Sequence, residues 1–596
     1  MANLVAPVSS MQPLEERIIE FRGLNRQHFV EDGEMSDMKN LTSDNYPLLC
    51  PRKLRGQLTL PSDVVKPMKI MTKFERIAML AKKTDNTCGF FYRGTAESPI
   101  VYNGTTYTDW VEITEVVSLT SKTEMAAINT KICFFSPIDG RLVKGYIQVF
   151  RNGNSVTIGK FGYLEKIVRT TEGTYLSVSI DSDKATVTIP STLGEGYAAD
   201  DAIDVKGWLH FTSGGESKTA KCEVSCIIES ISRNESDGYV LELPRDTLIE
   251  LTGQGATDIT LRGEGSGDSY VPAEVTRTMP DIHHIIEWNN RLWGASDEDN
   301  TIYACKLGDP TNWKYFQGTS LDSYYAQQGS DENFTGCAAY SAHLIFFKPN
   351  SMIKVYGTSP STFQVNNTVC YGVESGSEKS VAIVNDTVFY KSSIGIMAYD
   401  GGTPYGISDR FNVKFSDAVG GTEGRKYYSS FKTEDGDYEL MVLDVDKGLW
   451  HKEDDVRFRD CCTLDGRLYF IEDVGTEDFD KDKVYIINPE TPTETKLQRD
   501  WMATFGAFDE LVEDRKIYSR MSLRFIAQPG TKVAVYIKMD DGEWELVKKF
   551  VYAGTGGETV PIVPRRCDRF SIKVVGTGDC EIKSLTRRFR RGSGVK

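Results

Sequence analysis

Histidine and cysteine are scarce, which limits the metal and redox chemistry open to this chain. Among 596 residues there are 6 histidines and 12 cysteines. No histidine pair has the HExxH spacing of a zinc protease, and the adjacent His283 and His284 would point to opposite faces of a strand. Cysteines such as Cys133 and Cys305 lie in apolar stretches, which is typical of buried free thiols. The sequence therefore predicts no metal site, no cofactor and no disulfide scaffold.

Long hydrophobic runs and an excess of positive charge are also missing. Apolar runs such as Leu344–Phe347 are far shorter than the roughly 18 residues of a membrane helix, and the first residues lack the pattern of a secretory signal. With 69 Lys and Arg against 85 Asp and Glu, the formal net charge is −16. A general nucleic-acid binder is not expected from this balance. It suits a protein that surrounds DNA without holding it, because acidic walls repel the phosphate backbone.

What the sequence does contain is a repeated pair of short apolar strands. In each pair, a strand follows Asn, Asp or Gly, a turn intervenes, and a second alternating strand comes next. The pattern recurs at intervals of roughly 40 to 50 residues, and its first strands contain Leu292, Ile345, Val388 and Leu468. Each unit is a small sheet that needs neighbours to cover both of its faces. This pattern predicts an all-β fold based on a β-propeller of six to seven blades.

Two blocks interrupt the repeat and predict further β-domains. Residues 139–275 alternate in polarity between tight turns such as Asn152-Gly153, which predicts an inserted β-barrel or sandwich. The end of the chain predicts a C-terminal β-sandwich-like domain. Met35, Met38 and Leu41 are three apart, which favours a helical turn within an otherwise extended arm. The predicted division is an N-terminal arm at 1–65, first blades at 66–138, an inserted domain at 139–275, remaining blades at 276–494 and a C-terminal domain with a basic tail at 495–596.

No complete catalytic motif is found along the chain. A GxSxG nucleophile elbow is absent, and the glycine-rich segments do not have the spacing of phosphate or dinucleotide loops. Carboxylates are plentiful, so a glycosidase-like pair stays open. We predict from the missing motifs that the protein is not an enzyme.

Two segments are more specific than any of these patterns. One runs from Trp288 to Ala295 as WNNRLWGA and continues to Trp313 through LGDPTNW. The other is FRGLN at 21–25, followed by GEMSDMKNL at 33–41. Together they resemble the tail nozzle proteins of tailed bacteriophages, also called packaged-DNA stabilisation or tubular tail proteins. The residues that carry the resemblance in the blade are Asn289, Asn290, Arg291, Leu292, Trp293, Gly294, Leu307, Gly308, Asp309, Pro310, Asn312 and Trp313.

The resemblance implies a structural virion protein. It implies a homohexameric ring below the portal and adaptor proteins that closes the DNA exit channel, retains packaged DNA and conducts it during ejection. Tail fibres or distal tail proteins would attach to the ring, and double-stranded DNA would pass without sequence-specific binding. The protein would be made in the host cytoplasm and located in the virion tail.

The basic end of the chain is expected to contact DNA or a partner, and the sequence also leaves two alternative functions open. The arginines expected to contact DNA or a partner are Arg587, Arg588, Arg590 and Arg591. An alternative function is a carbohydrate-binding or carbohydrate-cleaving propeller, such as a receptor-binding tail protein. Its cleft would hold paired carboxylates and aromatics, with Trp313 or Trp450 stacking on sugars. A third alternative is an intracellular propeller scaffold.

Overall fold

Almost all regular structure in the chain is β-strand, which confirms the predicted all-β class. The computed structural model describes residues 13–138, 141–190, 193, 196–234, 238–475, 482–496, 498–510 and 515–591. The first part of the predicted arm and the last five residues of the basic tail lie outside these ranges. Contacts divide the chain into two units, one formed by Met1–Glu75 with Cys370–Lys596 and one by Arg76–Val369.

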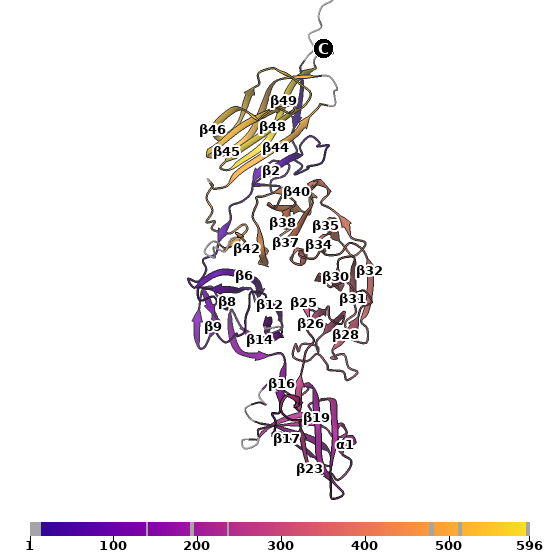
Figure 1. Cartoon of the computed structure of the whole chain (residues 1–596). Coiled ribbons are helices and arrows are strands. Elements are labelled where there is room, and N and C mark those ends of the chain that lie inside the picture. The colour runs from indigo at the N-terminus through magenta and orange to yellow at the C-terminus, as the bar shows by residue number, and fades with distance from the viewer. Residues whose placement is uncertain are drawn as a thin grey trace, which may run out of the picture. The chain divides into compact units, whose positions relative to one another are not determined.

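Small antiparallel sheets recur in both units and form a seven-bladed β-propeller arrangement (Figure 1). The predicted propeller is thus confirmed, at the upper of the two predicted blade counts. Central strands such as β26 (Arg291–Ser296) and β30 (His343–Lys348) are buried along their whole length, because neighbouring strands and sheets cover them. The four-stranded blades of the second unit consist of β25 (His283–Trp288), β26 (Arg291–Ser296), β27 (Thr301–Ala304) and β28 (Tyr324–Gln327), and of β29 (Gly336–Tyr340), β30 (His343–Lys348), β31 (Ser351–Tyr356) and β32 (Gln364–Val369).

The second unit also contains the first blades along the chain. One includes β7 (Arg76–Lys83), β8 (Cys88–Arg93) and β11 (Trp110–Glu112). The other has six strands: β9 (Ile100–Tyr102), β10 (Thr105–Tyr107), β12 (Glu124–Ile128), β13 (Lys131–Ile138), β14 (Arg141–Asn152) and β15 (Ser155–Tyr163). β14 and β15 fall inside the segment expected at 139–275 to form the inserted domain. The structure places them in the blade because β14 pairs with β13 along eight residue pairs.

The inserted domain begins at β16 and has a sheet and core of its own. Its strands are joined in the order β16-β24-β19-β23-β17-β18-β22-β21, and β20 pairs with β19. Leu209, Leu241 and Leu261 are among the buried residues of a core drawn entirely from this segment. The elements are β16 (Lys166–Arg169), β17 (Tyr175–Ile180), β18 (Lys184–Ile189), β19 (Ala202–Ser213), β20 (Glu216–Ile227), β21 (Ser230–Asn234), β22 (Gly238–Pro244), α1 (Asp246–Thr252), β23 (Thr257–Arg262), the 3-10 turn η1 (Gly267–Ser269) and β24 (Glu274–Arg277).

The first unit holds three more blades, and the last of them is completed by the N-terminal arm. β5 (Gly56–Gln57) pairs with β43 (Lys483–Ile486), so residues more than 400 positions apart share one sheet. β6 (Val64–Lys73) follows β5. The remaining elements are β33 (Ala382–Val384), β34 (Thr387–Ser392), β35 (Gly395–Tyr399), β36 (Tyr405–Gly406), β37 (Phe415–Glu423), β38 (Lys426–Thr433), β39 (Tyr438–Asp444), β40 (Leu449–Lys452), β41 (Phe458–Leu464) and β42 (Arg467–Glu472), with η2 (Glu378–Ser380) and η3 (Asp409–Phe411).

The C-terminal domain is an eight-stranded sheet that takes two strands from the arm. β1 pairs with β49 at one edge and β2 pairs with β44 at another. The long strand β45 pairs with β49 through its first half and β48 through its second. The strands are β1 (Leu14–Ile18), β2 (Met35–Lys39), β44 (Asp500–Phe508), β45 (Lys516–Met539), β46 (Glu545–Pro561), β47 (Arg566–Cys567), β48 (Phe570–Thr577) and β49 (Cys580–Arg591), and the arm adds the pair β3 (Leu41–Thr42) and β4 (Cys50–Pro51).

The helical turn expected around Met35 is wrong. β2 is a strand, and Met35 and Met38 are both buried although they are three residues apart. The register of β2 against β44 shifts between Met35 and Asp37. A β-bulge inserts one extra residue and so brings both side chains to the same face, which imitates helical spacing in the sequence.

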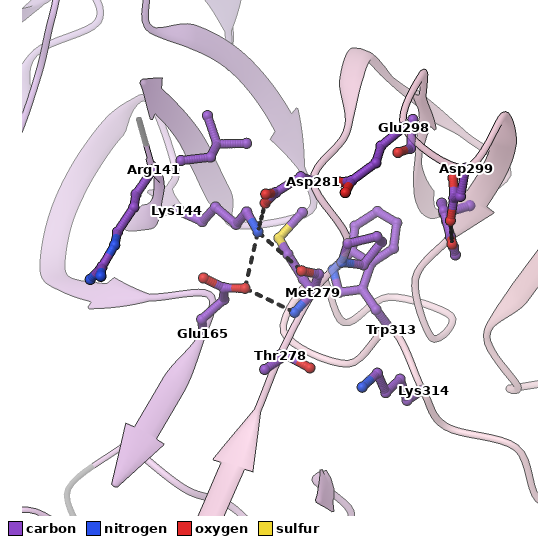
Figure 2. A pocket seen from close by; sticks show the side chains of 14 residues that line it. Arg141, Lys144, Glu165, Thr278, Met279, Asp281, Glu298, Asp299, Trp313 and Lys314 are labelled. Carbon is purple, nitrogen blue, oxygen red and sulfur yellow. Dashed lines mark hydrogen bonds and ion pairs between the residues drawn. The ribbon is translucent and has the colours of Figure 1, made fainter. Parts of the chain in front are cut away.

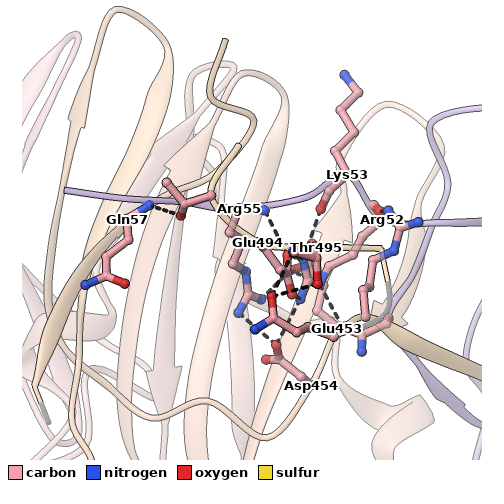
Figure 3. A network of polar contacts seen from close by, with 12 residues as sticks. Arg52, Lys53, Arg55, Gln57, Glu453, Asp454, Glu494 and Thr495 are labelled. Carbon is pink, nitrogen blue, oxygen red and sulfur yellow. Dashed lines mark hydrogen bonds and ion pairs between the residues drawn. The ribbon is translucent and has the colours of Figure 1, made fainter. Parts of the chain in front are cut away.

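Buried ion pairs fix the arm within the first unit (Figure 3). The Arg55 guanidinium lies 2.7 Å from both Glu453 and Asp454, on the segment after β40. Arg52 makes a bidentate pair with Glu494 at 2.8 and 2.9 Å. Because Arg52, Arg55 and Glu453 are buried, removing the partner of any of them would leave an uncompensated charge.

Candidate functional site

The WNNRLWGA segment forms the β25–β26 hairpin. Asn289 and Asn290 both have positive φ, at 51° and 58°, as a two-residue type I′ turn requires. Trp293 is completely buried, with its ring centroid 5.1 Å from that of Phe363. Leu292 belongs to a separate core cluster, and Gly294 faces Ile282, whose side chain a Cβ would meet at 2.5 Å. These residues shape the blade and expose no reactive group.

Arg291 is buried, has no carboxylate partner among the described residues, and holds the long loop between β27 and β28. Its guanidinium donates hydrogen bonds to the carbonyl oxygens of Cys305, Ser320 and Asp322 at 2.6–2.7 Å. Burial lowers the pKa of Arg291, because the charged form is removed from water. Three backbone acceptors thus fix both ends of the loop to one side chain.

The LGDPTNW segment lies in this loop and is organised by Asp309. The carboxylate accepts hydrogen bonds from the Thr311 amide at 3.1 Å and from the Asn312 side chain at 2.7 Å. Burial opposes ionisation, but Lys131 and these hydrogen bonds outweigh it and lower the pKa of Asp309. The neighbouring Gly308 amide donates to the Asn290 carbonyl at 2.7 Å, which ties the loop to the hairpin.

Asn312 joins this loop to the inserted domain. Its side-chain oxygen accepts a hydrogen bond from the Ala202 amide at 2.9 Å, and its nitrogen donates to Asp201 at 3.3 Å. Asp201 also forms a buried ion pair with Arg277, at the end of β24. Burial raises the pKa of Asp201, and the charge of Arg277 opposes the rise. The motif residues therefore act as a joint between blade and insertion.

The structure separates the four arginines predicted to contact DNA or a partner. Arg587 is buried and pairs with Glu510 at 2.5 Å and Asp32 at 2.9 Å. It is not accessible to DNA, because alternation along β49 turns it into the domain. Arg588 lies 3.6 Å from Glu15, and Arg590 and Arg591 are exposed.

A pocket of about 890 Å³ opens beside the joint, where the chain enters and leaves the inserted domain (Figure 2). The buried Lys144 contacts Glu165 and the Met279 carbonyl, each at 3.0 Å, and Asp281 at 2.5 Å. Glu165 in turn accepts a hydrogen bond from the Met279 amide at 3.1 Å. Lys144 thus holds together the two segments that connect the inserted domain to the propeller, one before β16 and one after β24.

The far side of this pocket is acidic and aromatic. Glu298 and Asp299 line it, and Tyr303 donates a hydrogen bond to Asp299. Burial, together with that bond, raises the pKa of Tyr303 to about 12, so its hydroxyl stays protonated. Tyr303 lies 6.4 Å from Tyr325, which lies 5.9 Å from Phe316, measured between ring centroids. Tyr325 is 61% exposed and Phe316 48% exposed.

Of the two tryptophans expected to stack on sugars, Trp313 lines this pocket (Figure 2), whereas Trp450 belongs to the first unit. Neither ring is exposed enough to stack on a sugar. Trp313 is 3% exposed and donates to the Pro310 carbonyl, and Trp450 is 2% exposed and donates to the Ile407 carbonyl. Both pack inside their units. Sequence reasoning missed Tyr303, Phe316 and Tyr325, because nothing local distinguishes an exposed aromatic residue from a buried one. Among the described residues, no group of three or more His, Cys, Asp or Glu is arranged to hold a metal ion, and no helix has the length and apolarity of a membrane span.

Comparison with known proteins gives no family. No family model and no curated protein matches the chain. Solved structures that match include an exo-β-1,3-galactanase from Phanerochaete chrysosporium with galactose, at 8% identity over 52% of this chain and 96% of that one, TM-score 0.21. PorZ, a surface component of the type-IX secretion system of Porphyromonas gingivalis, matches at 12% identity over 88% and 82%, TM-score 0.24. The acylaminoacyl peptidase of Pyrococcus horikoshii matches at 13% over 80% and 58%, TM-score 0.25.

These matches correct the prediction that the chain is not an enzyme. A glycoside hydrolase and a peptidase are among the propeller-type structures that it resembles, so missing sequence motifs are no ground for excluding catalysis. None of these three is a phage tail protein. At these TM-scores the likeness concerns the fold alone and assigns no activity to this chain.

Proposed function

We propose that this chain is a nozzle subunit in the tail of a tailed bacteriophage. In this proposal six copies form a ring below the portal and adaptor proteins and contact tail fibres or distal tail proteins. The ring closes the exit channel, retains packaged DNA and conducts it during ejection. The chain is made in the host cytoplasm and becomes part of the virion.

The observation that supports this proposal is the structural use of the nozzle-like motif. Asn290, Arg291 and Asn312 hold a hairpin, a loop and a domain joint in place. Residues used in this way specify an architecture rather than a reaction. The net charge of −16 supports passage of DNA without sequence-specific binding, because an acidic wall does not attract the phosphate backbone.

The test is the assembly state of the purified full-length chain, measured by light scattering with negative-stain images of the same sample. We expect closed rings with a central channel, formed alone or after addition of portal and adaptor proteins from the same phage. A chain that stays monomeric with those proteins present would contradict the nozzle.

A second function, carbohydrate binding, is favoured by the pocket beside the domain joint. Carboxylates from Asp281, Glu298 and Asp299 line it next to the exposed ring of Tyr325. Pockets that combine aromatic rings with a few polar groups are the usual form of small-ligand sites. Binding of the wild-type chain to an array of bacterial surface glycans tests this function, and an array without a signal would contradict it.

A further inference from the structure

An aromatic surface continues outward from the pocket described above. We define the aromatic patch as Tyr303, Phe316 and Tyr325. Tyr303 lines the pocket itself. Its ring centroid lies 6.4 Å from that of Tyr325, which in turn lies 5.9 Å from that of Phe316. Two large rings, those of Phe316 and Tyr325, are about half exposed and lie side by side. Exposed apolar patches of this kind usually mark binding sites.

The patch is held rigid by the loop that carries it. The Asp322 carboxylate accepts hydrogen bonds from the backbone amides of Gln317, Gly318 and Thr319 at 2.7–3.1 Å, directly after Phe316. Arg291 binds the carbonyls of the same turn. Tyr325 lies in β28 and pairs with Tyr303 of β27. A platform ordered before binding loses little conformational entropy when a ligand arrives.

The charges of the pocket select the kind of ligand. Lys144 is neutralised by Glu165 and Asp281, and Lys314 pairs with Asp204 at 2.7 Å. The groups left to meet a ligand are Glu298, Asp299 and Arg141, which together carry one net negative charge. Carboxylates accept hydrogen bonds from hydroxyl groups, whereas they repel another carboxylate.

We infer that the pocket and the aromatic patch form adjoining subsites for a neutral oligosaccharide of at least two sugar units. One sugar presents its C–H face to Tyr325 and Phe316. The next places its hydroxyl groups in the pocket, where they donate to Glu298 and Asp299 and accept from Arg141. This inference rests on the second proposed function and adds the site and the ligand class.

The test measures binding of neutral gluco- and galacto-oligosaccharides of two to six units to the full-length chain by calorimetry. Uronic-acid and sialylated oligosaccharides of the same length serve as the charged comparison. We expect the wild type to bind the neutral series and to reject the acidic one. The double variant Phe316→Ala/Tyr325→Ala should lose roughly tenfold or more in affinity, since an aromatic contact contributes about a kcal/mol.

Matched variants separate the site from general effects. Tyr371→Ala removes a tyrosine of similar exposure in the other unit and should leave affinity unchanged. Glu298→Lys should admit the acidic oligosaccharides and weaken neutral binding. Thermal melting of each variant shows whether it has folded.

Three outcomes would overturn the inference in distinguishable ways. Glycan binding that survives Phe316→Ala/Tyr325→Ala keeps the second function and rejects this site. A wild type that binds no glycan of any charge rejects both. Loss of ring assembly in the double variant, without glycan binding in the wild type, assigns the patch to contacts between copies instead.

Discussion

Asn312 shows how one side chain can hold two domains together. Its side-chain amide accepts a hydrogen bond from the backbone amide of Ala202 on the inserted domain. It also donates a hydrogen bond to the Asp309 carboxylate in its own loop. We predict that Asn312→Ala lowers the free energy of unfolding by about 1–3 kcal/mol, because buried polar groups lose their partners. Urea unfolding measures the loss, and Asn154→Ala in the exposed β14–β15 turn is the control. If the two variants have the same free energy of unfolding, the hydrogen bonds of Asn312 do not stabilise the contact between its loop and the inserted domain.

His451 makes the first unit sensitive to acid. It is buried, and neither ring nitrogen has a hydrogen-bond partner among the described residues. Burial, aided by Lys426, lowers its pKa from 6.5 to about 3; Lys447 also lowers it, while Asp44 and Asp444 oppose the shift. Since the unfolded state then binds more protons between pH 6.5 and 3, stability falls as the pH drops through this window.

The variant His451→Leu should remove that part of the pH dependence. Between pH 6.5 and 4.5 the free energy of unfolding of the wild type should fall by about 2–3 kcal/mol more than that of the variant. The figure follows from two pH units, each of which corresponds to about 1.4 kcal/mol for one proton. Urea unfolding at both pH values measures the difference. His28→Leu, at an exposed position, should behave like the wild type. If the free energy of unfolding falls by the same amount in the wild type and in His451→Leu, other groups cause the acid sensitivity.

At the scale of elements, the loop between β27 and β28 depends on a single buried guanidinium. Lysine keeps the charge but cannot reach three carbonyl groups in fixed directions. We predict that Arg291→Lys leaves the blade folded and loosens the loop, so that amide exchange near Gly318–Asp322 rises while that of β30 stays slow. Unchanged exchange in the loop would show that the Asp322 turn suffices. The same variant should weaken any oligosaccharide binding at the aromatic patch.

At the scale of the whole molecule, the inserted domain is a separable body. Its core comes only from its own residues, and Lys166 and Arg277 face each other across β16 and β24, so both ends lie together. We predict that the excised fragment 165–278 folds alone and unfolds cooperatively, as measured by circular dichroism. When 166–277 is replaced by a short Gly-Ser linker, the remaining residues should keep the strands that they form in the whole chain. A fragment without a melting transition would show that the Asn312 joint is needed for folding.

Local signals in the sequence determined the fold class and many of its turns. Alternating apolar residues specify strands, and the Asn289-Asn290 pair specifies a hairpin, since both depend only on neighbouring residues. The β-propeller followed from the repetition of such units. The predicted helical turn failed because a β-bulge buries Met35 and Met38 at helical spacing.

Only the tertiary structure decided which distant strands share a sheet and which side chains face one another. β5 joins β43, and β2 joins β44, across more than 400 residues. Tertiary packing also turned Arg587 toward Glu510, and the folding of one blade and its β27–β28 loop brought Tyr303, Phe316 and Tyr325 to one surface. Long-range pairing depends on how whole sheets close and pack, and no local pattern of residues encodes it.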